Sequence, residues 1–136
     1  MVFTSSISNV DLNANVASAS PAVAETNASQ VQILRLNGRF DAYEVPAVAA
    51  FLNEKIDAGQ NNLVVNLSNV GFIDSAALST LVQAMKRARQ SGGDCRLCAL
   101  QQSVRIIFEL TRLDRAFQIF SDEAVATQSY ALQPVF

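Results

Sequence analysis

One stretch of the sequence, residues 63–89, constrains the fold more than any other. It begins with a strand-like apolar run, LVVNL, and continues through a short polar segment to Asp74 and Ser75. The apolar residues that follow recur every three or four positions, as one buried helix face requires: Leu78, Leu81, Val82, Met85 and Ala88. A hydroxyl-bearing loop between the end of a strand and the start of a helix is a common place for function in α/β proteins.

The same succession of strand and helix recurs along the chain. Strands are predicted at 31–36, 63–67, 95–100 and 117–120, and helices from 41 to about 59, 75–90, 103–111 and 123–129. Connections of this kind favour a parallel or mixed sheet covered by helices. The sequence therefore predicts a single α/β domain with a mixed, mostly parallel sheet of four to five strands and about four helices.

Local signals set the expected ends of these elements. Asn37 and Gly38 are expected to close the first strand. Asp41 precedes Glu44 by three residues, which is the spacing of a capping box and predicts that Asp41 caps the first helix. Pro46 would then lie in the first turns, where a missing N–H group costs little.

Composition separates an N-terminal arm from the rest. Residues 1–30 are rich in Ser, Ala and Asn and carry only Asp11 and Glu25 as charges, which favours a flexible or loosely attached arm, with a short edge strand at 2–7 as an option. Residues 31–136 are expected to form the domain. The net charge is −2 and the pI is near 5.0, so no basic field favours nucleic acid or an anionic membrane.

The chain of 136 residues contains no histidine. This absence removes the usual general base, metal ligand and proton switch, and it excludes a Ser-His-Asp triad around Ser75. A metal site built from Asp41, Asp74 and Asp114 would require three loops to converge, and catalysis is the less favoured interpretation. No cofactor is expected. No apolar run is long enough to span a bilayer, and no signal peptide is recognised, so the expected location is the cytoplasm.

Two cysteines, Cys95 and Cys98, form a C-x-x-C spacing within a predicted strand. Side chains three residues apart on a strand point to opposite faces, and no second cysteine pair completes a zinc site. We therefore expect both thiols to pack in the core.

Chemistry alone leaves two roles open for Ser75. Asp74 or Ser75 could simply cap the helix, as residues of this type commonly do. Alternatively, a phosphate on Ser75 would be held favourably by the helix N-terminus and would add about two negative charges beside Asp74. The two roles are compatible, because one position can both start a helix and carry a phosphate.

Several motifs together resemble one known family. They are the L-x-G-x-x-D run formed by Leu36, Gly38 and Asp41, the stretch NLSNVGFIDS from Asn66 to Ser75, and the Gly-Gly-containing entry to the next strand. This pattern resembles the STAS domain family and, within it, the bacterial single-domain anti-sigma factor antagonists. The resemblance covers about residues 31–129, and alanine replaces the family's glycine at position 77.

The resemblance implies a regulatory protein that works by partner switching and is not itself an enzyme. The unphosphorylated form would bind an ATP-dependent serine kinase that is also an anti-sigma factor. Phosphorylation of Ser75 would release it, and a metal-dependent serine phosphatase would reset it. The implied partner-binding residues are Arg39, Asp41, Asp74, Ser75, Ala76, Ala77, Leu78 and Ser79.

Two alternatives remain beside this interpretation. The first is a STAS scaffold or interaction module in a larger signalling assembly, in which Ser75 is a plain helix cap. The second is a small hydrolase that uses Ser75 or a metal held by aspartates.

Overall fold

The computed structural model describes residues 30–131, and in this range four strands form one sheet in the order β1-β2-β3-β4. All three neighbouring pairs are parallel. The strands are β1 (Gln32–Phe40), β2 (Asn62–Ile73), β3 (Asp94–Cys98) and β4 (Ile119–Phe120). The predicted α/β class is confirmed, and the sheet is parallel throughout the described range. The optional strand at residues 2–7, which would have made the sheet mixed, lies outside the described residues.

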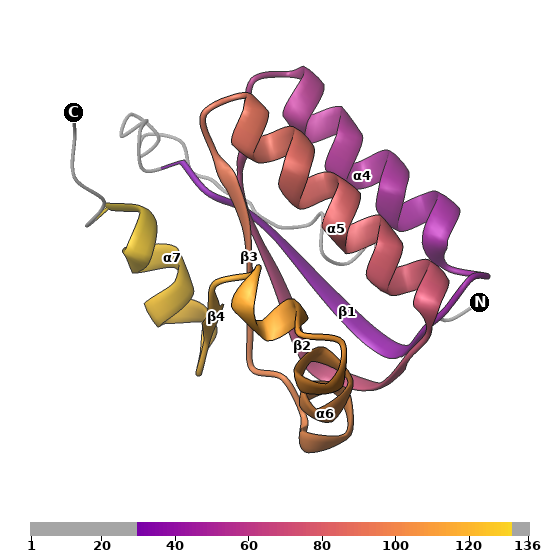
Figure 1. The fold of residues 1–136 in the computed structure, drawn as a ribbon. Coiled ribbons are helices and arrows are strands. Elements are labelled where there is room, and N and C mark those ends of the chain that lie inside the picture. The colour runs from indigo at the N-terminus through magenta and orange to yellow at the C-terminus, as the bar shows by residue number, and fades with distance from the viewer. Residues whose placement is uncertain (1–29, 132–136) are drawn as a thin grey trace.

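Helices connect the strands and cover the sheet. They are α4 (Val45–Asp57), α5 (Ser75–Gln90), α6 (Gln102–Leu110) and α7 (Glu123–Ala131), with a short 3₁₀ helix, η2 (Leu113–Arg115), after α6. Helices α4 and α5 run side by side along one face of the sheet, whereas α7 lies on the other side of β3 and β4 (Figure 1). Within residues 30–131, no helix combines the length and the apolar character needed to cross a bilayer.

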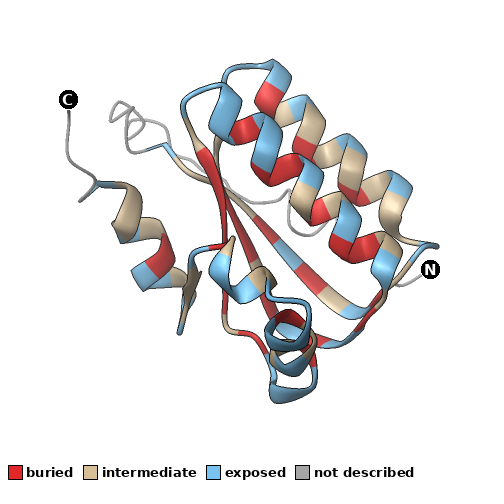
Figure 2. Ribbon diagram, in the orientation of Figure 1, coloured by how far each residue is buried: buried red, intermediate tan, exposed pale blue. Residues whose placement is uncertain are grey.

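The buried residues form two clusters, one on each face of the sheet (Figure 2). The larger cluster joins the sheet to α4, α5 and α6, and it includes Leu34, Leu52, Leu81 and Phe108. The smaller cluster joins the sheet to α7, and it contains Val64, Cys98 and Ala126. Both faces of the sheet are therefore covered by helices, as the apolar composition of its strands requires.

The two cysteines lie on opposite faces of β3, as predicted. Cys95 belongs to the larger cluster and Cys98 to the smaller one, and both are fully buried free thiols. Burial raises the pKa of both thiols to about 12. Such thiols are poor nucleophiles and poor metal ligands, which supports a packing role.

Strands β1 and β2 both extend beyond the predicted ends. The sequence predicted that Asn37-Gly38 closes the first strand, but β1 continues to Phe40 and β2 continues to Ile73. Asn37 pairs with Asn69 across the two strands, and the Asn69 side-chain amide donates to Asn37 Oδ1 at 2.9 Å. Backbone pairing between the two polar segments therefore continues both strands, with two register shifts at which β2 advances by one residue more than β1.

Helix α4 begins later than predicted, and the expected capping box does not form. Glu44 is the N-cap residue and its side chain makes no capping hydrogen bond. Asp41 instead organises the preceding turn, because its carboxylate accepts from the Tyr43 amide at 3.1 Å and its carbonyl accepts from the amides of Glu44 and Val45. The acidic spacing therefore marks a turn before the helix.

A buried ion pair that was not predicted from the sequence lies at the start of β3. The Asp94 carboxylate accepts from Arg96 Nε at 3.0 Å, from Arg89 Nε at 2.8 Å and from the Cys95 amide at 2.8 Å. Arg96 is 4% exposed. The Asp94 carboxylate and the Arg96 guanidinium compensate each other's burial, since a buried charge without a counter-ion is strongly unfavourable.

Tyr130 attaches α7 to this ion pair. Its hydroxyl lies 2.7 Å from the Leu63 carbonyl oxygen and 2.8 Å from the Asp94 carbonyl oxygen. The Arg96 guanidinium lies over the Tyr130 ring, 4.0 Å from its centroid, and donates to Ser129 Oγ at 2.7 Å. Helix α7 is therefore joined to the sheet by polar contacts as well as by its small apolar face.

Candidate functional site

Ser75 is the first residue of α5 and lies just beyond the carboxyl end of β2. Its side chain is exposed. Within residues 30–131, its hydroxyl makes no hydrogen bond to another protein group. Because β1 and β2 are parallel, their carboxyl ends meet at one edge of the sheet, and the turn at 41–44 lies beside the start of α5.

Asp74, rather than Ser75, caps helix α5. Its backbone is extended and its Oδ1 accepts from the Ala77 amide at 2.9 Å, while its Oδ2 accepts from the Ala42 amide at 3.0 Å. The Asp74 amide donates to the Phe40 carbonyl at 3.3 Å. These bonds hold the pKa of Asp74 below its usual value, chiefly through the Ala77 amide. One ionised side chain therefore fixes two loops and leaves the neighbouring serine hydroxyl unengaged.

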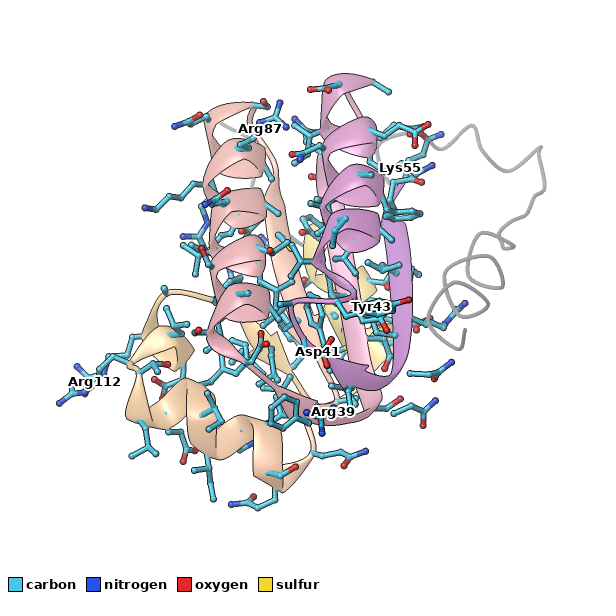
Figure 3. All side chains as sticks on the ribbon, turned by 90° about the vertical axis from the view of Figure 1, so that its right-hand side faces the viewer. Arg39, Asp41, Tyr43, Lys55, Arg87 and Arg112 are labelled. Carbon is cyan, nitrogen blue, oxygen red and sulfur yellow. The ribbon has the colours of Figure 1, made fainter. Side chains whose placement is uncertain are left out.

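Arg39 and Phe72 lie next to each other at the ends of β1 and β2. They are partners in the strand register, and the Arg39 guanidinium carbon is 3.8 Å from the centroid of the Phe72 ring. Arg39 Nε is also 3.5 Å from Asp41 Oδ2. Figure 3 shows Arg39, Asp41 and Tyr43 together at this end of the molecule, while Lys55 and Arg87 lie toward the other end of α4 and α5.

Two aromatic residues of this surface were not predicted from the sequence. Tyr43 is 76% exposed in the turn before α4, and Phe72 is 39% exposed at the end of β2. A large apolar side chain in a polar loop is an available signal of a contact surface, since such residues usually become buried. Position 72 was predicted only as part of the connection between the strand and the helix.

The first turn of α5 divides the predicted partner-binding residues into two groups. Ser75 and Ser79 are exposed and Ala76 is half-buried, so these three can present surface. Ala77 and Leu78 are buried in the larger core cluster. In the free chain they support the surface from below. The methyl group of Ala77 therefore adds no bulk to the outer face.

The chemistry of this site is that of exposed polar groups around a fixed loop. Within the described residues, no group of three or more histidine, cysteine, aspartate or glutamate side chains is placed to hold a metal ion. Asp114 belongs to η2, whereas Asp41 and Asp74 are drawn together by the turn at 41–44. The site therefore combines the unbonded Ser75 hydroxyl with the carboxylates of Asp41 and Asp74, the Arg39 guanidinium and two exposed aromatic rings.

Comparison with known proteins places this site in context. An anti-sigma F factor antagonist of Paenibacillus polymyxa is 28% identical over 97 residues, which is 71% of this chain and 83% of that protein. A STAS-domain anti-sigma-factor antagonist protein from Planctomyces limnophilus superposes with a TM-score of 0.69 at 21% identity, over 76% of this chain and 92% of that chain.

The Bacillus protein SpoIIAA has the same fold and has been solved in two states. Its unphosphorylated form gives a TM-score of 0.63 at 16% identity, over 78% of this chain and 93% of that chain. Its phosphorylated form gives a TM-score of 0.61 at 20% identity, over 74% and 91%. These structural similarities are evidence for the fold.

The family assignment comes from the sequence match. The STAS domain family model matches residues 20–126. The related anti-sigma factor antagonists are regulators and not enzymes. Since the match extends over most of the chain and the fold agrees with it, this chain belongs to the STAS domain family.

Proposed function

We propose that this STAS protein is an anti-sigma factor antagonist-like regulator controlled by phosphorylation of Ser75. With Ser75 unmodified, it binds a serine kinase that also acts as an anti-sigma factor. Phosphorylation releases it, and a metal-dependent serine phosphatase restores the binding form. The observation that carries the proposal is the exposed, unbonded hydroxyl of Ser75 beside Asp74, whose two oxygens are occupied by backbone amides.

The proposed modification is a phosphoryl transfer from ATP. Ser75 Oγ attacks the γ-phosphorus, and the bond from that phosphorus to the bridging oxygen of ADP breaks. The hydroxyl proton passes to a base on the kinase, and ADP leaves. Because Asp74 already caps α5, the Ser75 hydroxyl can react without removing a bond that holds the helix.

The phosphorylated form should keep its fold. Backbone amides in the first turn of a helix and the helix dipole both favour an anion at this position. The added group carries a charge of about −1.5 to −2 at neutral pH. A partner that fits the uncharged loop would then meet repulsion and a desolvation penalty, so binding changes while the core does not.

The proposed contact surface surrounds Ser75. It uses Arg39, Asp41, Asp74, Ala76 and Ser79 from the residues predicted by sequence. Tyr43 and Phe72 join them because they are large, exposed and close to the same turn. Aromatic and arginine side chains are the types that most often dominate binding energy at interfaces.

A phosphorylation assay tests the site directly. The purified protein, its cognate serine kinase and ATP should give a product that carries a single phosphate by intact-mass spectrometry. The Ser75→Ala variant should give none. Ser91→Ala is the matched control, because Ser91 is an exposed serine at the opposite end of α5, outside the proposed contact surface, and this variant should be phosphorylated normally. Phosphate on Ser79 or Thr80 with Ser75 unmodified would overturn the assignment.

A binding assay tests the switch. Ser75→Ala should retain the kinase in a pull-down, whereas Ser75→Asp should bind it at least tenfold more weakly. Equal affinities for the two variants would refute control by charge at this position.

A further inference from the structure

Arg39 is held by two weak contacts beside the serine loop. Its Nε lies 3.5 Å from Asp41 Oδ2, at the limit of a hydrogen bond, and its guanidinium lies over the Phe72 ring. The Arg39 side chain is 64% exposed. Exposed ion pairs of this kind contribute little, so a stronger anion nearby can replace Asp41.

The contrast with Arg35, on the same strand, is large. Arg35 binds Glu123 through two nitrogens, with Nε at 2.9 Å and Nη2 at 2.6 Å from the carboxylate oxygens. Of the three guanidinium nitrogens of Arg39, only Nε donates a hydrogen bond to another described residue. Both terminal nitrogens therefore remain available. A planar guanidinium with free N–H groups matches the geometry of a phosphate.

The Asp74 side chain is not free to move away from a phosphate on Ser75. Both of its oxygens are engaged by backbone amides of two different loops. A phosphate on Ser75 would therefore add its charge next to a fixed carboxylate and close to Asp41. Arg39 already acts electrostatically on Asp74, alongside the hydrogen bonds that lower the pKa of that carboxylate.

We infer that Arg39 is the intramolecular counter-ion of phosphorylated Ser75. This inference rests on the proposed function and adds its regulation. On phosphorylation, the guanidinium moves from Asp41 and the face of Phe72 to the phosphate. Phosphorylation then changes two loops, because Asp41 loses its ion pair and the Phe72 ring loses the cation that covers it.

The test uses the full chain with phosphoserine introduced at position 75 during translation, so it does not depend on any kinase. The pKa of the phosphate is measured by ³¹P NMR titration, with Asp41 and Asp74 unchanged in every variant. Arg39→Gln should raise this pKa by about 0.5 or more, because a nearby cation favours the dianion. The phosphate pKa of the Arg39→Lys variant should lie between those of Arg39→Gln and the parent, since lysine keeps the positive charge but lacks the planar guanidinium.

Arg35→Gln is the matched control, because it removes an arginine from the same strand whose partner is Glu123 of α7. It should leave the phosphate pKa unchanged. In the parent protein, the NMR signal of the Arg39 Nε–H group should shift and exchange more slowly with water when Ser75 carries phosphate. The Arg35 signal should not change. This second measurement needs no arginine variant.

Equal phosphate pKa values in the parent and Arg39→Gln would overturn the inference. An Arg39 Nε–H signal that is the same with and without phosphate on Ser75 would also overturn it. Failure of a kinase to modify Ser75 would instead overturn the proposed function. The two failures are distinguishable because the phosphoserine in this experiment is introduced during translation and not by a kinase.

Discussion

The buried pair Asp94–Arg96 supports the sharpest prediction about stability. Asp94→Asn keeps the size of the side chain and an oxygen for the Cys95 amide, but it removes the negative charge that faces Arg96. The side chains of Asp94 and Arg96 are 7% and 5% exposed. The substitution therefore leaves a guanidinium buried without its carboxylate.

The magnitude follows from that burial. Removing one member of a buried ion pair destabilises proteins by about 3–5 kcal/mol, a large part of the roughly 5–15 kcal/mol that holds a domain folded. Arg89 also binds Asp94, but its side chain is 42% exposed, so Arg89→Gln should destabilise by about 1 kcal/mol or less. Loss of the Asp94–Arg96 pair should therefore destabilise the protein much more than loss of the Asp94–Arg89 pair.

Urea denaturation followed by circular dichroism measures these differences. A double variant, Asp94→Asn with Arg96→Met, should be about 1–3 kcal/mol more stable than Asp94→Asn alone, because it also removes the buried cation that has lost its carboxylate. Two results would refute the reasoning. One is an Asp94→Asn variant no less stable than Arg89→Gln, and the other is a double variant less stable than Asp94→Asn.

Two further predictions concern a pair of glycines and the Asp74 cap. A Cβ at Gly93 would lie 2.0 Å from the Asn61 carbonyl oxygen, whereas one at Gly71 would meet only the Gln101 side chain at 3.5 Å. Gly93→Ala should therefore destabilise by about 2 kcal/mol or more, and Gly71→Ala by about 0.5 kcal/mol or less, in the same urea assay; similar effects would contradict the steric argument. The lowered pKa of Asp74 means that its contribution to stability is present above its unfolded value of 3.8 and is lost as pH falls through the lower folded value. The stability difference between the wild type and Asp74→Asn should accordingly narrow on going from pH 7 to below pH 4, and a constant difference would count against an ionised cap.

Local patterns predicted the elements whose signals are local. Helix α5 runs from Ser75 to Gln90 as expected, because its apolar face has a clear period and Gly92-Gly93 follows it. The lengths of β1 and β2 could not be read in the same way. Asn37 and Asn69 look like turn residues, and only their pairing across the sheet keeps them in strands.

The same distinction applies to the site. Asp74 and Ser75 were located from the strand–loop–helix pattern, but the pattern could not say which of them caps the helix. Asp74 caps the helix through the Ala77 amide, and its other oxygen accepts from the amide of Ala42, 32 residues away in sequence, a contact that no local pattern shows. The prediction of a capping box at Asp41 and Glu44 was wrong, because the Asp41 carboxylate accepts a hydrogen bond within the turn that precedes α4. The Asp94–Arg96 pair was also hidden, since alternating polar residues at a strand start usually face solvent.

The double attachment of Asp74 affects how variants at this site should be interpreted. Because its carboxylate bonds to Ala77 in α5 and to Ala42 in the turn before α4, any replacement loosens both segments together. A binding defect in an Asp74 variant would mix altered shape with altered charge, and would not identify Asp74 as a contact residue. Ser75→Ala removes only an exposed, unbonded hydroxyl, so it is the cleaner genetic probe of this surface in cells.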